Sequence, residues 1–144
     1  MEKYFVNYKQ ALKLKELGFD EECLAYYDGW NGNTHLIIND ELSPKFLVRF
    51  FNLFKRKKHQ TYSQDYVEYL NGFCTAPLKS QVFDWFRMEY KLKGYVEPVE
   101  YLDGTPETYM WFVYNNCNSG NEQLTYEEAE ELCIDKLIEI VKNK

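Results

Sequence analysis

Apolar residues recur at helical spacing in residues 8–17, the first predicted helix. Asn7 precedes this segment and can cap its N-terminus, and Gly18 follows it and can adopt the left-handed conformation that ends a helix. A short amphipathic helix is therefore predicted near the N-terminus. Its apolar side is formed by Ala11, Leu14 and Leu17.

The strongest helical pattern lies in PLKSQVFDWFRMEYKLKG, residues 77–94. Pro77 is typical of a first helical turn and Gly94 of a helix end, so the predicted helix runs from 77 to about 93. Its apolar side chains cover about half of the circumference, a band wide enough to lie flat across a sheet. They are Leu78, Val82, Phe83, Trp85, Phe86, Tyr90 and Leu92.

The third predicted helix begins at the sequence TYEE near the C-terminus. Thr125 and Glu128 have the spacing of a capping box, and Leu124 and Ala129 are placed for a hydrophobic staple. Acidic residues gather in its first turns and lysines in its last, as the helix dipole favours. The predicted buried stripe consists of Tyr126, Ala129, Cys133, Ile134, Leu137, Ile138 and Val141.

Two pairs of strands are predicted from β-prone runs that flank turn-rich segments. One hairpin joins residues near 22–27 to residues 34–38, and the other joins 95–102 to 108–116 through the turn DGTPE. Pro98 cannot donate to a ladder, so the strand 95–102 is placed at an edge or at a bulge. The strand 108–116 is apolar on both faces, which is typical of a strand covered on both sides.

The middle of the chain contains a further amphipathic segment. Ser43 as N-cap and Pro44 at the first helical position predict a helix over residues 44–57. A strand over 45–51 is the alternative, because apolar residues alternate there. Residues 60–75 are predicted to be loop-like, with a short helix from Ser63 to Leu70 as an alternative within them.

The predicted elements follow the order α-β-β-α-α-β-β-α, which indicates the α+β class. With 144 residues, of which 45% are hydrophobic and 18% aromatic, the chain has the length and the apolar content of one folded domain. We expect a single domain over residues 1–144, with helices packed on a small antiparallel or mixed sheet. An α/β/α sandwich is one arrangement of these layers.

The charge and the cysteine content of the chain indicate which partners and which cellular compartment to expect. The formal charge is −6 and the pI is near 5.0, which argues against coating of the whole surface by nucleic acid or by an anionic membrane. No signal-peptide core and no apolar run of about 18 residues is found, so we expect a cytoplasmic protein without a membrane span. The four cysteines form no CxxC pair and have no histidine at zinc-ligand spacing, so we expect reduced thiols, no metal and no cofactor.

Residue patterns typical of active sites are not found in the sequence. His35 and His59 lie near no nucleophile elbow such as GxSxG. The turn DGWNGN lacks the pattern of a P-loop or of GxGxxG. Runs of adjacent acids, such as those within residues 127–131, are typical of solvated faces and helix starts. We therefore expect a protein that is not an enzyme.

Three segments together resemble a known family: QALKLKELGFDEECLAYYDG (10–29), APLKSQVFDWFRMEYKL (76–92) and TYEEAEELCIDKLIEIV (125–141). They are similar to uncharacterised small proteins of bacterial prophages and mobile elements, of a phage α/β/α-sandwich-like family. The shared motifs are helix caps, apolar stripes and helix stops. The resemblance therefore implies a fold and a phage-related setting, and it transfers no catalytic residue. It also makes residues 42–75 an elaboration that shorter members lack.

The strongest functional candidate is a basic cluster between Ser43 and Gln64, a stretch without acidic residues. Lys and Arg at this density can contact the phosphates of nucleic acid, and a basic amphipathic helix also suits an anionic membrane surface or an acidic protein. The alternative is a solvated helix end that the dipole favours. The members of this cluster are Lys45, Arg49, Lys55, Arg56, Lys57 and Lys58.

Glu89 is the carboxylate that falls within the apolar half of a predicted helix, between Trp85 and Leu92. Burial there would raise its pKa and make Glu89 a pocket carboxylate, whereas a rim position would leave it in water. We expect a non-enzymatic phage or mobile-element accessory protein that acts through protein–protein contact, with a second copy of the chain as one candidate partner. Nucleic-acid binding through residues 45–59 is the alternative.

Overall fold

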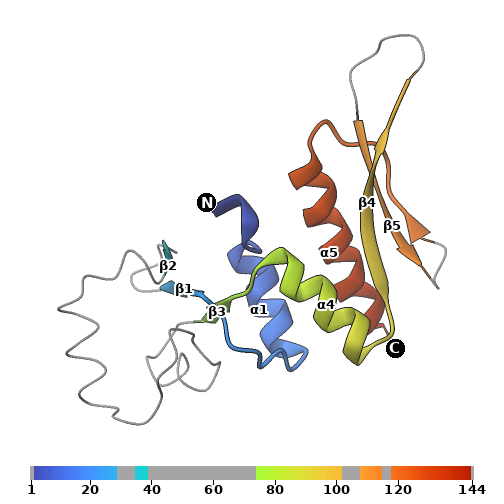
Figure 1. Ribbon diagram of the computed structural model, residues 1–144. Coiled ribbons are helices and arrows are strands. Elements are labelled where there is room, and N and C mark those ends of the chain that lie inside the picture. Colours follow the sequence, from blue (N-terminus) through green and yellow to red (C-terminus); the bar gives the residue numbers. More distant parts are fainter. Residues whose placement is uncertain (1, 29–34, 39–73, 102–107, 115–117, 144) are drawn as a thin grey trace, which may run out of the picture. The chain divides into compact units, whose positions relative to one another are not determined.

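The computed structural model describes residues 2–28, 35–38, 74–101, 108–114 and 118–143 (Figure 1). The chain divides into an N-terminal unit, Asn7–Pro77 together with Glu2, and a C-terminal unit, Lys3–Val6 together with Leu78–Lys144. Each unit combines helix with an antiparallel three-stranded sheet, so the predicted α+β class is confirmed. We expected one sheet from the order of the strands, whereas the described strands form two.

The N-terminal unit begins with helix α1, Tyr8–Glu16. The Asn7 side chain accepts a hydrogen bond from the Gln10 backbone N–H at 3.0 Å, and the Gln10 side chain accepts one from the Asn7 N–H at 3.3 Å. Gly18 has φ +88°, the left-handed conformation that favours glycine. The predicted cap and stop are therefore confirmed.

The sheet of this unit has the order β2-β1-β3, with β1 at Ala25–Asp28, β2 at His35–Ile38 and β3 at Cys74–Ala76. Strands β1 and β2 pair in the register Tyr26↔Ile37, which confirms the first predicted hairpin. The prediction of a loop through residue 75 is wrong at its end, because β3 pairs with β1 and is buried along its length. A strand of three residues is too short to show a period of two.

Residues 39–73 lie outside the described residues. They contain the predicted helix 44–57, its strand alternative 45–51 and most of the predicted loop 60–75. The six basic residues of the predicted site also belong to this segment. These predictions therefore stay predictions.

The C-terminal unit contains a 3₁₀ turn at Glu2–Tyr4, whose first residue is grouped with the other unit, and helix α4 at Lys79–Glu89. The prediction of a helix from 77 to about 93 is wrong at both ends. Leu78 is the residue before the helix, and Lys91 ends it by adopting φ +57°. A lysine thus occupies the left-handed conformation that we assigned to Gly94, which lies instead in the following strand.

The second sheet has the order β4-β5-β6, with β4 at Lys93–Val99, β5 at Thr108–Tyr114 and β6 at Asn118–Ser119. The second predicted hairpin is confirmed as antiparallel, and among the described strands β4 lies at the edge of this sheet, as Pro98 indicated. Strand β6 was not predicted from the sequence, because it consists of only two residues.

Helix α5, Tyr126–Lys142, packs against β4 and β5, and α4 packs against β4 and α5 (Figure 1). The capping box is confirmed: Thr125 Oγ1 and Glu128 Oε2 each accept the other residue's backbone N–H at 3.2 Å. The predicted staple is wrong, since Leu124 is 79% exposed. The buried residues of α5 are Ala129, Cys133, Ile134, Leu137, Ile138 and Ile140.

Candidate interaction surface

The two faces of the β4–β5 hairpin have different surroundings. A Cβ added to Gly94 would lie 2.8 Å from both Cys133 Sγ and Leu137 Cδ1, so Gly94 is on the face that meets α5. Because side chains alternate along a strand, Trp111 and Val113 share this inner face, and both are buried. Val96, Pro98 and Tyr109 belong to the inner face by the same register. The alternate residues point to the opposite side, which we call the outer face: Lys93, Tyr95, Glu97, Val99, Thr108, Met110, Phe112 and Tyr114.

The outer face is rich in aromatic side chains that reach solvent. Tyr95 is 40% exposed and Tyr114 is 61% exposed, while Met110 and Phe112 are half-buried. The prediction that strand 108–116 is covered on both sides is therefore wrong at Tyr114. Its apolar pattern did not show which face the helices would cover, because that choice is made by tertiary packing.

The outer face contains an aromatic pair. Tyr95 and Phe112 are directly opposite across β4 and β5, with ring centroids 5.3 Å apart and an angle of 21° between the rings. Lys93 and Glu97 flank this pair on β4, and both are exposed. Stacked rings that are held by two paired strands give a rigid apolar surface with a charge at each end.

The other predicted site residues do not join this surface. Glu89 is the last residue of α4, and its side chain is exposed. The structure thus places Glu89 in water, which was the alternative to the pocket carboxylate. Within the described residues no group of three or more His, Cys, Asp or Glu could hold a metal ion. No helix in the described part of the chain is both long and apolar enough to cross a bilayer.

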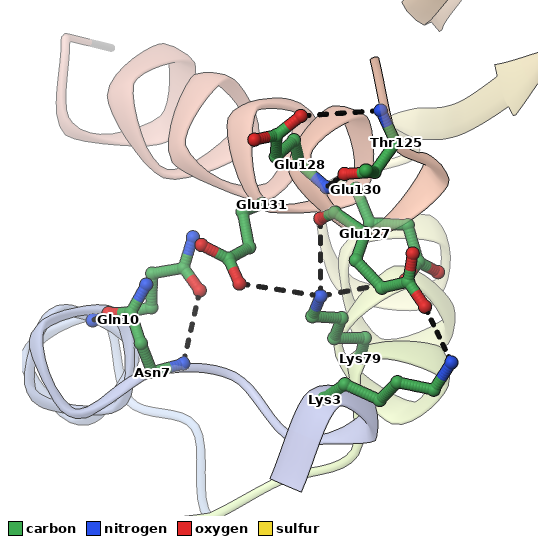
Figure 2. A network of polar contacts seen from close by, with 9 residues as sticks. All are labelled: Lys3, Asn7, Gln10, Lys79, Thr125, Glu127, Glu128, Glu130 and Glu131. Carbon is green, nitrogen blue, oxygen red and sulfur yellow. Dashed lines mark hydrogen bonds and ion pairs between the residues drawn. The ribbon is translucent and has the colours of Figure 1, made fainter. Parts of the chain in front are cut away.

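Lys79 forms a polar network that the sequence analysis missed (Figure 2). Its side chain is buried at the start of α4, and its ammonium donates to the backbone carbonyl of Glu127 at 3.3 Å. Carboxylate oxygens of Glu130 and Glu131 each lie 3.6 Å from Lys79 Nζ. The acidic start of α5, which we interpreted as a solvated face at a helix start, therefore also neutralises a buried lysine on the neighbouring helix.

The pKa values in this network have identifiable causes. Burial raises the pKa of Glu130, and the opposing attraction of Lys79 is smaller. Burial, followed by repulsion from Glu130, raises the pKa of Tyr126. At the surface, the 2.7 Å ion pair between Lys3 and Glu127 raises the pKa of the lysine and lowers that of the carboxylate. Lys79 is enclosed by oxygen atoms, so the network serves to hold α4 to α5.

Three cysteines are described, and all three are free and buried. Burial raises the pKa of Cys23 to about 12, of Cys74 to about 11 and of Cys133 to about 12. Only the thiolate is a good nucleophile, so these thiols are suited to packing and not to covalent catalysis. The three described cysteines therefore pack as small hydrophobic residues.

The fold and this surface together define an α+β protein with an aromatic sheet face that is open to solvent. We compared the chain with protein-family models, with curated proteins and with solved structures, and none of the three comparisons gives a match.

Proposed function

We propose that this chain is a non-enzymatic protein–protein interaction module that binds its partner through the outer face. The observation that carries the proposal is the stacked Tyr95–Phe112 pair, which lies beside a Tyr114 that is 61% exposed. Aromatic side chains are enriched among the residues that dominate binding energy, because they bury a large area and lose little conformational entropy.

The rest of the described chain supports an interaction function better than a catalytic one. The described thiols are buried, and the buried lysine is engaged by the first turns of α5. The phage or mobile-element setting stays an expectation from the resemblance alone. Nucleic-acid binding by residues 45–59 also stays a prediction, since these residues lie outside the described part of the chain.

The proposal is tested by site-specific photo-cross-linking of the full chain in the cells that express it. A photoreactive phenylalanine derivative replaces Tyr114 on the outer face. The matched control replaces Met88, a large side chain on α4 that is 66% exposed and lies outside the outer face. We expect an adduct of one defined mass from position 114 upon irradiation and a much weaker one from position 88. Equal or absent adducts at the two positions would contradict the proposal.

A further inference from the structure

The charges of the outer face have a pattern that is complementary to itself. Along β4, Lys93, Tyr95 and Glu97 occupy alternate positions, so a cation and a carboxylate stand at equal distances on either side of Tyr95. Neither Lys93 nor Glu97 forms an ion pair with another described residue. Their charges are therefore available to a partner.

We propose that the partner of the outer face is a second copy of this chain, packed face to face. The two-fold axis lies between the two sheets and runs perpendicular to the strands, over Tyr95 and Phe112. This inference rests on the proposed function and names its partner. A two-fold axis requires a surface that matches itself, since residue i of one copy meets residue j of the other and residue j meets residue i in return. Here the axis would place Lys93 of one copy opposite Glu97 of the other, twice per dimer.

The same operation brings the apolar residues together. The Tyr95–Phe112 row lies on the axis and meets its own copy, so the two stacked pairs form the centre of the contact. Tyr114, which pairs with Lys93 across the hairpin, would face Met110, which pairs with Glu97. Aligned packing of two twisted sheets gives this arrangement, with the strands about 30° apart.

The size of the surface sets the strength of the contact. An axis at Tyr95 and Phe112 overlaps five residues of each strand, 93–97 and 110–114, which correspond to about 16 Å in length at ~3.3 Å per residue. Two to three strands spaced by ~4.8 Å make the face about 10–14 Å wide. Such a face has a flat area of about 160–220 Å² per copy, or roughly 300–450 Å² on both copies, which is below the ~1,200 Å² of stable specific interfaces. We therefore expect a weak dimer with a Kd of roughly 100 µM or higher.

The test is sedimentation velocity of the full chain from about 5 to 500 µM, a range chosen to span that Kd. Lys93→Glu places like charges opposite each other at both ends of the contact, and Glu97→Lys does the same with the other sign. Each single variant should weaken the dimer about 10-fold or more. The double variant exchanges the two charges, restores the complementarity and should return the Kd to within about 3-fold of the original.

Glu89→Lys is the matched control, because Glu89 is exposed on α4 and the substitution changes the net charge as Glu97→Lys does. It should leave the dimer unchanged. An equimolar mixture of the two single variants should form a heterodimer that neither variant forms with itself. All variants should melt like the original chain, since Lys93 and Glu97 are exposed.

A chain that stays monomeric over the whole range would overturn this inference, as would a dimer that is indifferent to the charge exchange. Monomeric behaviour with loss of stability in Tyr114→Ser would indicate that the chain covers the face itself. If position 114 cross-links to a different protein while the chain is monomeric, the proposed function stands and only the second copy is excluded. If position 114 gives no specific adduct and the chain is monomeric, both proposals fail.

Discussion

Lys79 shows at the scale of one residue how a buried charge is accommodated, since its side chain is buried and lysine is almost never buried without partners. Lys79→Met keeps most of the apolar stem and removes the ammonium, so Glu130 loses its counterion in a partly buried place. We expect a loss of about 1–3 kcal/mol in the free energy of unfolding, which is less than for a fully buried pair because Glu131 is half exposed.

Urea denaturation at pH 7 measures the effect of Lys79→Met. The control is Arg87→Met, which removes an exposed ion pair to Asp84 within the same helix. Such surface pairs contribute little, so this variant should lose less than about 0.5 kcal/mol. Equal losses in the two variants would show that the buried Lys79 contacts contribute no more to stability than an exposed ion pair.

The raised pKa of Glu130 predicts a pH dependence with a definite sign. A carboxyl group whose pKa is higher in the folded state binds its proton more tightly there. Its contribution to stability is then complete below the unfolded pKa, about 4.3, and is lost as the pH rises through the folded pKa. Relative to the original chain, Glu130→Gln should therefore gain stability between pH 4 and pH 7.

Glu127 supplies the opposite case, because its pKa is lowered by the ion pair with Lys3. Its contribution is present above the unfolded pKa and is lost as the pH falls through the folded one. As the pH rises toward about 5, Glu127→Gln should therefore lose stability relative to the original chain, and the difference should stay constant above that pH. Chemical denaturation at several pH values gives the stability of each variant relative to the original chain. If both differences change with pH in the same direction, the two pKa shifts are not of opposite sign.

At the scale of an element, the contact between β4 and α5 depends on the absence of a side chain at position 94. A Cβ there would lie 2.8 Å from Cys133 Sγ and 2.9 Å from Phe83 Cε1. We expect Gly94→Ala to cost about 1–3 kcal/mol, as overpacked cores do. The Cys133 thiol is one of the crowded groups. Cys133→Ala should therefore lower the free energy of unfolding less in a chain that already carries Gly94→Ala than in the original chain.

Thermal or urea unfolding of the two single variants and the double variant completes this cycle. Glu97→Ala serves as the control, since Glu97 lies on β4 but points to the outer face. It should change stability by less than about 0.5 kcal/mol. Strictly additive losses for Gly94→Ala and Cys133→Ala would show that the two side chains do not compete for space.

The elements that the sequence predicted well are those specified by nearby residues. The caps at Asn7 and Thr125 depend on side chains within one helical turn, and both formed as predicted. The end of α4 was missed because a lysine at position 91 adopts a conformation that favours glycine. Strands β3 and β6 were missed because three and two residues are too few to show periodicity.

The candidate surface was predictable only in part. The alternation of apolar residues in β5 was visible in the sequence, but the choice of the face that α5 covers depends on contacts across the C-terminal unit. The burial of Lys79 has the same origin, since the acids that neutralise it lie about 50 positions away in the chain. Its only sequence signal is the run of acids at the start of α5.

At the scale of the whole molecule, the question is whether residues 1–144 unfold as the single domain that the sequence predicted. The chain divides into two units, and each contains buried cysteines among its described residues. Cys23 and Cys74 belong to the N-terminal unit, and Cys133 belongs to the C-terminal unit. These thiols are protonated at pH 8 because burial raises each pKa to about 11 or 12. Alkylation of a thiol therefore reports the opening of its own unit.

We expect Cys23 and Cys74 to become reactive at a lower urea concentration than Cys133. The described strands of the N-terminal unit have three or four residues, and α1 has nine. The C-terminal unit has helices of 11 and 17 residues packed on strands of seven, so it buries longer apolar faces. Brief iodoacetamide labelling in a Cys117→Ser chain, read by peptide mass, measures the three thiols separately. If all three become reactive at one urea concentration, the two units unfold together, and residues 1–144 behave as one cooperative domain.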